Sequence, residues 1–384
     1  MAQRFALFAT TTRGTEDLLA EELTALGAQR VRQDRGGVRF MANLLEALRI
    51  CLWTRIAMRV LWPLGDFKVV GAEGLYQAAA QVPWEEHLNA STTFAVDATL
   101  KDSEHDHSGF VALKIKDAVV DRLREKLGAR PDVDTRNPAV RIVAHISGQQ
   151  LSLSLDLVGE PLNRRGYRVE PTGAPLKETL AAAILRAANY TGQEPLVDPM
   201  CGSGTLVIEA ALIAQNRAPN LDRPFAAERW PQQGPKAREL LAELRAEARA
   251  QQGPAPFPIW GFDRDEEALE ASRKNISAAG LNGVITLGLA DATLPLPIPS
   301  DIKGLLVTNP PYGDRLTAGG QKGMKTFYYK LGESLGNYRG LRMAILSGNE
   351  AFESAFHKRP FRNRSLFNGP IACELLAYAA LDPA

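Results

Sequence analysis

The stretch that decides the fold is Asp198-Pro-Met-Cys-Gly-Ser-Gly-Thr205. An apolar run ending at residue 197 precedes it, and the helix-like apolar run 206–214 follows it. Gly202 and Gly204 remove side chains where the backbone must approach a ligand closely, and Thr205 can satisfy free amides at the start of the helix. A strand, a glycine turn and a helix in this order indicate a nucleotide-binding unit.

Outward from this stretch, further apolar strands end in polar residues. The runs 259–263, 284–291 and 304–309 end in Asp263, Asp291 and Asn309, and helical stretches lie between them. From about residue 161 the alternation predicts an α/β domain with a doubly wound parallel sheet. Ligands of such a sheet bind beyond the carboxyl ends of the strands, where these side chains are expected.

A nicotinamide cofactor is excluded by spacing. Gly204 is followed by Thr-Leu-Val, so the third glycine of a dinucleotide fingerprint is missing, and Asp263 lies about 60 residues on instead of about 20. Asp263 is expected to accept hydrogen bonds from ribose hydroxyls, or to cap the helix Glu266–Ala279; the two roles can coexist. Asp291-Ala292 suits the amino group of adenine.

The motif Asn309-Pro-Pro-Tyr312 points to methylation of an amine. The prolines stiffen the turn and remove two backbone donors, so the Asn309 side-chain oxygen and the Pro310 carbonyl are free to accept from one NH₂ group. Tyr312 offers a flat face for an extruded base. Holding both amine hydrogens localises the nitrogen lone pair and aims it at an electrophilic methyl group.

The first 160 residues predict smaller α+β modules. The pattern strand 5–9, helix Thr15–Leu26, strand 38–40 and helix 44–52 describes one of them. Farther on, apolar residues alternate with polar ones over 140–146 and again over 151–157, which predicts a hairpin in an antiparallel sheet backed by helices.

Composition sets the remaining limits. The 384 residues suggest two or three domains, and a formal net charge of +1 argues neither for nor against nucleic acid. Three distant cysteines without metal-ligand spacing argue against a zinc site and fit a reducing cytoplasm. No signal peptide and no apolar run long enough to span a membrane is recognised. Local basic clusters lie at Arg30–Arg39 and Arg164–Arg168.

With these motifs in order, the sequence resembles the THUMP-containing 23S rRNA guanine-N2-methyltransferases of bacteria. The flanking segments 163–168, 174–183 and 366–375 carry the more specific part of the resemblance. It implies a ferredoxin-like α+β module at 1–60, a THUMP RNA-binding domain at 61–160, and a Rossmann-like class I methyltransferase domain at 161–384. It also implies S-adenosylmethionine as cofactor, and 23S rRNA or a large-subunit assembly intermediate as partner. Some family members carry a second methyltransferase; here it is expected to be absent.

The resemblance places functional residues on the motifs. The cofactor-binding residues would be Asp198, Pro199, Cys201, Gly202, Ser203, Gly204, Thr205, Asp263, Asp291, Ala292 and Asn309. The catalytic residues would be Asn309, Pro310, Pro311 and Tyr312, and no metal is expected.

Several alternatives stay open at this point. The same chemistry suits methylation of guanine N2 in tRNA or of adenine N6 in DNA. A further alternative is a non-catalytic RNA-binding or assembly factor with a degenerate enzyme fold. Lys177 and Glu178 can line the cofactor site or cap a helix, and Cys201 is interpreted as a small loop residue. The insertion Asn216–Pro258, with Arg229-Trp230, has no assigned role.

Overall fold

The computed structural model describes residues 3–170, 176–311 and 320–380, and it describes no side chain at 320 and 321. The chain divides into two compact units. The first contains residues up to Thr11, Ala20–Leu162 and Asn220–Glu247; the second contains Thr12–Leu19, Asn163–Pro219 and the part from Ala248 onward. No helix in the described part of the chain is both long and apolar enough to cross a membrane.

The first unit is built on one continuous seven-stranded sheet in the order β2-β3-β1-β4-β7-β6-β5. Its strands are β1 (Phe5–Thr10), β2 (Gln29–Asp34), β3 (Gly37–Ala42), β4 (Arg59–Lys68), β5 (Phe94–Lys101), β6 (Val140–Ser147) and β7 (Gln150–Asp156). Its helical segments are α2 (Leu44–Trp53), α3 (Gly71–Gln81), η1 (Trp84–Glu86), α4 (Ser108–Leu127) and η2 (Ala226–Arg229). The helices α1 (Glu16–Ala25) and α7 (Gly234–Ala250) each have residues assigned to both units.

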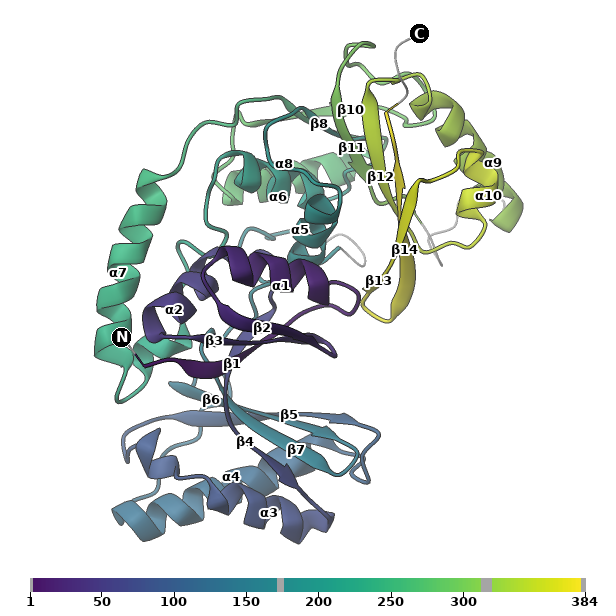
Figure 1. Cartoon of the computed structure of the whole chain (residues 1–384). Helices are drawn as coiled ribbons and strands as arrows, with labels where there is room; N and C mark the ends of the chain where they lie inside the picture. The colour runs from purple at the N-terminus through teal and green to yellow at the C-terminus, as the bar shows by residue number, and fades with distance from the viewer. Residues whose placement is uncertain (1–2, 171–175, 312–319, 381–384) are drawn as a thin grey trace. The chain divides into compact units, whose positions relative to one another are not determined.

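The predicted hairpin is confirmed as β6 and β7, which pair antiparallel from Ser147↔Gln150 to Ile142↔Leu155. Val140, Ile142, Ala144 and Ile146 are fully buried, as their alternation predicts. The expected antiparallel sheet has one parallel pair at its edge, where β5 runs parallel to β6. Helices α3 and α4 pack against each other beside these strands (Figure 1).

The second unit contains the doubly wound sheet, in the order β10-β9-β8-β11-β12-β14-β13. Its strands are β8 (Leu196–Asp198), β9 (Ile259–Asp263), β10 (Ile285–Leu289), β11 (Gly304–Thr308), β12 (Leu341–Ser347), β13 (Arg362–Asn368) and β14 (Ile371–Tyr378). Its helices are α5 (Glu178–Ala187), α6 (Thr205–Ala214), α8 (Glu266–Ala278), α9 (Gly320–Leu335) and α10 (Phe352–Phe356). The five neighbouring strands β10, β9, β8, β11 and β12 are parallel to one another. Strand β14 pairs antiparallel with β12, and β13 pairs antiparallel with β14 at the edge of the sheet.

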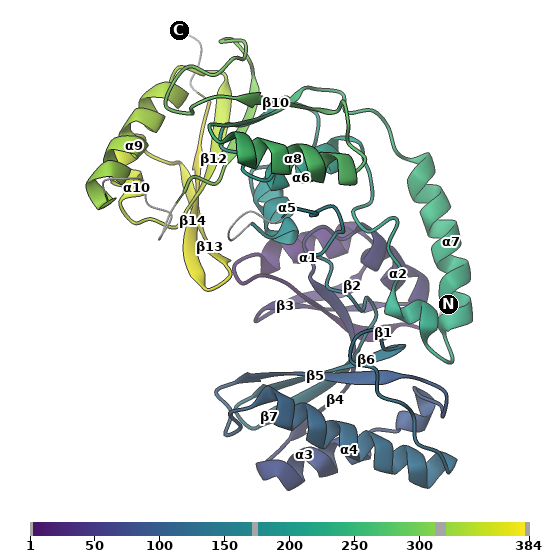
Figure 2. The same cartoon turned by 180° about the vertical axis from the view of Figure 1, so that it is seen from behind.

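This sheet is buried on both faces. Leu305 and Val307 of β11 belong to a core cluster shared with α5, α6 and α8, whereas Leu306 belongs to a second cluster shared with α9 and α10. Figures 1 and 2 show these two helix groups on opposite sides of the strands. The predicted Rossmann-like, doubly wound sheet is therefore confirmed. The strand order reverses between β8 and β11, so the switch point where such sheets bind ligands lies beside Asp198 and Asn309.

Candidate active site

The loop after β8 depends on its glycines. Gly202 has φ +55° and Gly204 has φ +83°, a left-handed conformation that other residues rarely adopt. Gly204 is the N-cap of α6, and a Cβ there would lie 3.1 Å from the Ser272 hydroxyl. The loop therefore turns sharply enough to bring backbone to the ends of β8 and β9.

Behind the loop, α8 holds it in place. Ser272 donates to the carbonyl of Gly202 over 2.6 Å, and the Asn275 side chain donates to the carbonyl of Ser203 over 3.0 Å. The other side of the Asn275 amide accepts from the backbone amides of Val169 and Glu170. The sequence did not predict the roles of Ser272 and Asn275, because a polar residue in a helix gives no sign of a contact with a loop that is distant in sequence.

Arg168 is the second support of the loop. Its guanidinium donates to the hydroxyls of Ser203 (3.3 Å) and Thr205 (3.1 Å), to the carbonyl of Leu176 (2.9 Å) and to the Glu178 carboxylate (3.0 Å). Glu178 is thus a buried partner of Arg168. Burial raises the pKa of the Glu178 carboxyl, although the nearby Arg168 charge opposes the shift.

Asp198 and Cys201 are buried within the loop. Asp198 is 1% exposed and accepts from the amide of Met200 over 3.1 Å. Burial raises its pKa to about 7; the Thr308 hydroxyl and the Met200 amide oppose this, and Asp263 adds to it. Burial also raises the pKa of the Cys201 thiol well above its ordinary value, so the sulfur stays protonated and unreactive.

Asp263, at the end of β9, is tied to the loop. Its Oδ2 accepts from the amide of Gly202 over 2.8 Å, and its Oδ1 accepts from the amide of Asp265 over 3.1 Å. Asp265, whose side chain accepts from the amide of Glu267, is the N-cap of α8. The capping role considered for Asp263 therefore belongs to Asp265. Each Asp263 oxygen keeps a lone pair for a further donor.

Asp291 follows β10 and is ordered by Thr293, whose amide and hydroxyl both donate to its Oδ1. Burial raises the pKa of Asp291, but these hydrogen bonds and the charges of Arg264 and Lys330 outweigh it and hold the pKa below its ordinary value. The carboxylate is therefore ionised at neutral pH. Ala292, beside it, is buried.

Asn309 follows β11 and presents an acceptor. Its side-chain oxygen is buried and has no hydrogen-bond partner among the residues that the structure describes. The carbonyl of Pro311 accepts from the hydroxyl of Tyr328 over 3.0 Å, which anchors the proline turn to α9. Pro310 is buried, and Tyr312 lies outside the described residues.

Residues that follow these strands line one cavity of about 380 Å³. This volume is in the range of ordinary ligand pockets, about 300–1,000 Å³. The residues that line it are Pro199, Met200, Gly202, Asp263, Arg264, Asp265, Ala268, Ala290, Asp291, Ala292, Asn309, Pro311 and Phe327. Asp198, Cys201, Ser203, Gly204, Thr205 and Pro310 are not among the lining residues; the first five shape the loop instead.

Metal ligands do not gather in the part of the chain that is described. Within 3–170, 176–311 and 320–380, no group of three or more His, Cys, Asp or Glu side chains could hold a metal ion. Among the described residues that line the cavity, Asp263, Asp265 and Asp291 are carboxylates and Arg264 is the one cation. The surroundings of the cavity therefore favour a positively charged ligand.

Comparison with solved structures gives whole-chain matches. A candidate methyltransferase solved in complex with SAH is 31% identical, with a TM-score of 0.88 and full coverage of both chains. A chain from Listeria monocytogenes described as a predicted N6-adenine-specific DNA methylase is 29% identical, with a TM-score of 0.85 over 98% of this chain and 97% of that one.

Comparison with curated proteins finds relatives that are named as methyltransferases of ribosomal RNA. The ribosomal RNA large subunit methyltransferase K/L of Syntrophotalea carbinolica is 44% identical over 97% of this chain and 53% of its own length. The chain spans about half the length of the curated relatives of this name that it matches.

Family comparisons divide the chain into three stretches. Residues 6–61 match the RlmL ferredoxin-like domain, 71–156 the THUMP domain, and 165–377 the RMKL-like methyltransferase domain. The last match covers more than half of the chain and contains the whole cavity described above. The resemblance seen in the sequence is confirmed: the chain belongs to the RMKL-like methyltransferase family, with ferredoxin-like and THUMP domains ahead of the methyltransferase domain.

Proposed function

We propose that this chain is an S-adenosylmethionine-dependent methyltransferase that methylates N2 of a guanine in 23S rRNA. The observation that carries the proposal is the side-chain oxygen of Asn309, which is buried and has no hydrogen-bond partner among the described residues. Asn309 is one of the residues that line the same cavity as Asp263 and Asp291. A buried acceptor without a partner costs free energy, so its retention here favours a ligand that donates to it.

The cavity suits S-adenosylmethionine in shape and charge. Asp263 can accept from the ribose hydroxyls while its hydrogen bond to Gly202 keeps the loop in register. Asp291 and Ala292 suit the adenine end, and Pro199 and Gly202 line the side on which the methionine part would lie. When bound, the cofactor supplies an electrophilic methyl group. Asp198, Cys201, Ser203, Gly204 and Thr205 would serve it indirectly, by fixing the loop.

The chain would promote the transfer by orientation. Asn309 Oδ1 and the Pro310 carbonyl would accept the two hydrogens of the guanine amine, which localises the nitrogen lone pair toward the methyl group. The Pro311 carbonyl already accepts from Tyr328, so it is assigned the anchoring role. Tyr312 keeps the proposed role of a stacking platform for the extruded base. No covalent enzyme intermediate is required.

The choice of RNA rests on the domains ahead of the catalytic one. The THUMP and ferredoxin-like matches and the relatives named as large-subunit rRNA methyltransferases support 23S rRNA, or a large-subunit precursor, as substrate. We keep the assignments 1–60 ferredoxin-like, 61–160 RNA-binding and 161–384 catalytic, and we assign the protein to the cytoplasm, where that substrate is made.

Methyl transfer from labelled S-adenosylmethionine to total RNA from a strain lacking the gene tests the proposal. RNA is separated by size, and the labelled nucleoside is identified by mass spectrometry, with Asn309→Ala as the matched inactive control. N2-methylguanosine in large-subunit rRNA is the expected result. Label in tRNA would replace the substrate. A parallel reaction with genomic DNA of the same strain tests for N6-methyladenine, which would also replace it. Cofactor binding without label in RNA, ribosomal precursors or DNA would refute the activity.

A further inference from the structure

The insertion between α6 and β9 contributes to the first unit. Its middle part, Asn220–Glu247, clusters with the N-terminal sheet although both flanks belong to the methyltransferase domain. Asn220 donates to the carbonyls of Cys51 and Thr54 over 3.0 and 3.1 Å, and Arg229 donates to the carbonyl of Pro138 over 2.8 Å. These contacts fix the segment that carries Trp230.

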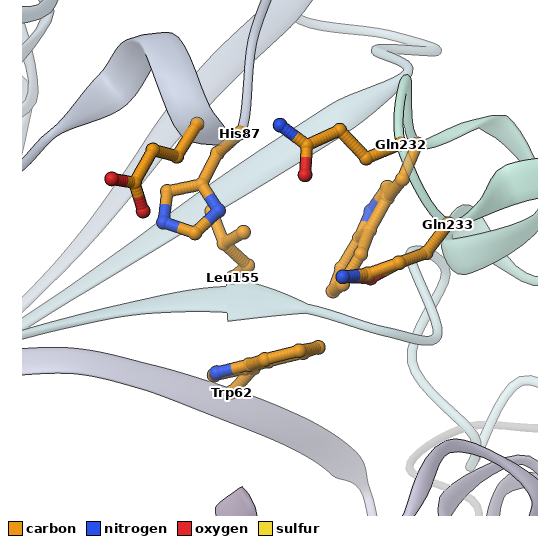
Figure 3. A pocket seen from close by; sticks show the side chains of 7 residues that line it. Trp62, His87, Leu155, Gln232 and Gln233 are labelled. Carbon is orange, nitrogen blue, oxygen red and sulfur yellow. The ribbon is translucent and has the colours of Figure 1, made fainter. Parts of the chain in front are cut away.

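Trp230 and the sheet enclose a second pocket, separate from the catalytic cavity. The residues that line it are Trp62, Glu86, His87, Leu155, Trp230, Gln232 and Gln233. Figure 3 shows Trp62, His87, Gln232 and Gln233 grouped around one space, with Leu155 of β7 beside it. The two indole rings lie 5.9 Å apart, tilted by 48°, and Trp62 also stacks on Phe5. Trp62 is thus held by aromatic contacts to two residues.

Trp230, one of the residues that line the pocket, carries a hydrogen-bond donor without a partner among the described residues. Trp230 is 6% exposed, and its indole N–H is buried without a hydrogen-bond partner among the described residues. Buried indole N–H groups are ordinarily bonded, so this one favours an external acceptor. Gln232 and Gln233 add amide donors and acceptors. Burial lowers the pKa of His87, although Glu86 and Glu85 oppose the shift, so its imidazole is neutral at pH 7 with one donor and one acceptor.

We propose that this pocket binds an unpaired nucleobase of the RNA substrate, away from the catalytic cavity. A nucleobase combines the flat face that indoles stack on with an edge of donors and acceptors that amides and the Trp230 N–H can read. A phosphate is disfavoured, because none of the described residues that line the pocket is a lysine or an arginine, and one of them is Glu86. The proposal rests on RNA being the substrate.

The size of the pocket says how a base would enter. The enclosed space is about 20 Å³, enough for one water molecule. A base therefore enters only when rim side chains rotate, and Gln232 and Glu86 are both exposed. Side-chain rearrangement of this kind is common on binding. The competing interpretation is a closed pocket that holds a single water molecule and no base.

Two variants and one control separate these interpretations in the full-length chain. Gln232→Ala removes an exposed amide at the rim, and Trp230→Phe keeps a ring but removes the N–H. Gln252→Ala removes an exposed glutamine of the same insertion outside the pocket. The probe is a set of single-stranded 12-nucleotide RNAs of A, C, G and U, with binding followed by tryptophan fluorescence and by anisotropy of a labelled end.

Each pocket variant is expected to weaken RNA binding about fivefold, the effect of about one hydrogen bond, while Gln252→Ala matches the wild type. In methyl transfer, the same variants should raise KM for RNA and leave kcat and the Kd for S-adenosylmethionine unchanged. Unchanged RNA affinity and KM in both variants would overturn the pocket assignment, while wild-type transfer to RNA keeps the proposed function. If the wild type neither binds nor methylates RNA, both proposals fail.

Discussion

The Asp263 carboxylate accepts a hydrogen bond from the Gly202 amide over 2.8 Å, so the end of β9 fixes the position of the loop after β8. The two strands are neighbours in the sheet, but Gly202 and Asp263 are 61 residues apart along the chain. One side chain can therefore both shape the cofactor loop and present acceptors to the cavity.

Asp263→Ala is expected to weaken S-adenosylmethionine binding at least tenfold, because it removes charged acceptors for the ribose and releases Gly202. Isothermal titration calorimetry measures this change. Asp301→Ala, an exposed aspartate outside the cavity, is the control. An unchanged Kd for Asp263→Ala would contradict the cofactor role.

Asn309→Ala is expected to lower kcat by about 10²-fold or more, the usual effect of removing one preorganised polar group that acts in the transition state. The Kd for S-adenosylmethionine should change little, because Asp263 and Asp291 remain. Single-turnover methyl transfer at saturating cofactor, beside calorimetry, separates the two effects. Equal loss of turnover and of cofactor affinity would show that Asn309 only shapes the cavity.

Arg168→Lys is expected to raise the Kd for S-adenosylmethionine several-fold, although Arg168 is not among the cavity-lining residues. Lysine is a point charge and cannot reproduce the four hydrogen bonds that the planar guanidinium makes to Ser203, Thr205, Leu176 and Glu178. Arg164→Lys, an exposed change in the same segment, is the control. If the two variants bind the cofactor equally well, the loop does not depend on Arg168.

Asp198 should make the stability of the chain depend on pH. Its folded pKa of about 7 lies above the ordinary 3.8, so the folded state favours the protonated form. As pH rises from about 4 to about 7, the wild type should lose up to about 1.4 kcal/mol per pH unit relative to Asp198→Asn, and the difference should level off above pH 7. Thermal unfolding of both proteins between pH 5 and 8 measures this. If the stabilities of the wild type and of Asp198→Asn change with pH in parallel, the pKa of Asp198 is not raised in the folded state.

The sequence by itself determined the strands β8 to β11 of the second sheet and the polar residues that follow them, but not β12 or β13. Short apolar runs with polar residues at their ends identified β8, β9 and β11, and the period of two identified β6 and β7. These patterns are local, because burial imposes its period on consecutive residues. Asp263, Asp291 and Asn309 could therefore be placed at one edge of the sheet from the sequence alone.

Other elements depend on neighbours that are distant in sequence. Strand β2 was not predicted, since five of its six residues are exposed and it shows no alternation; pairing with β3 makes it a strand. The capping of α8 by Asp265 and the support of the loop by Arg168 and Asn275 also depend on approach across the fold. The packing of Asn220–Glu247 with the first unit also depends on contacts between segments that are distant in sequence. Hydrogen bonds between distant segments leave no periodic trace in the sequence, and only the tertiary structure decides which groups meet.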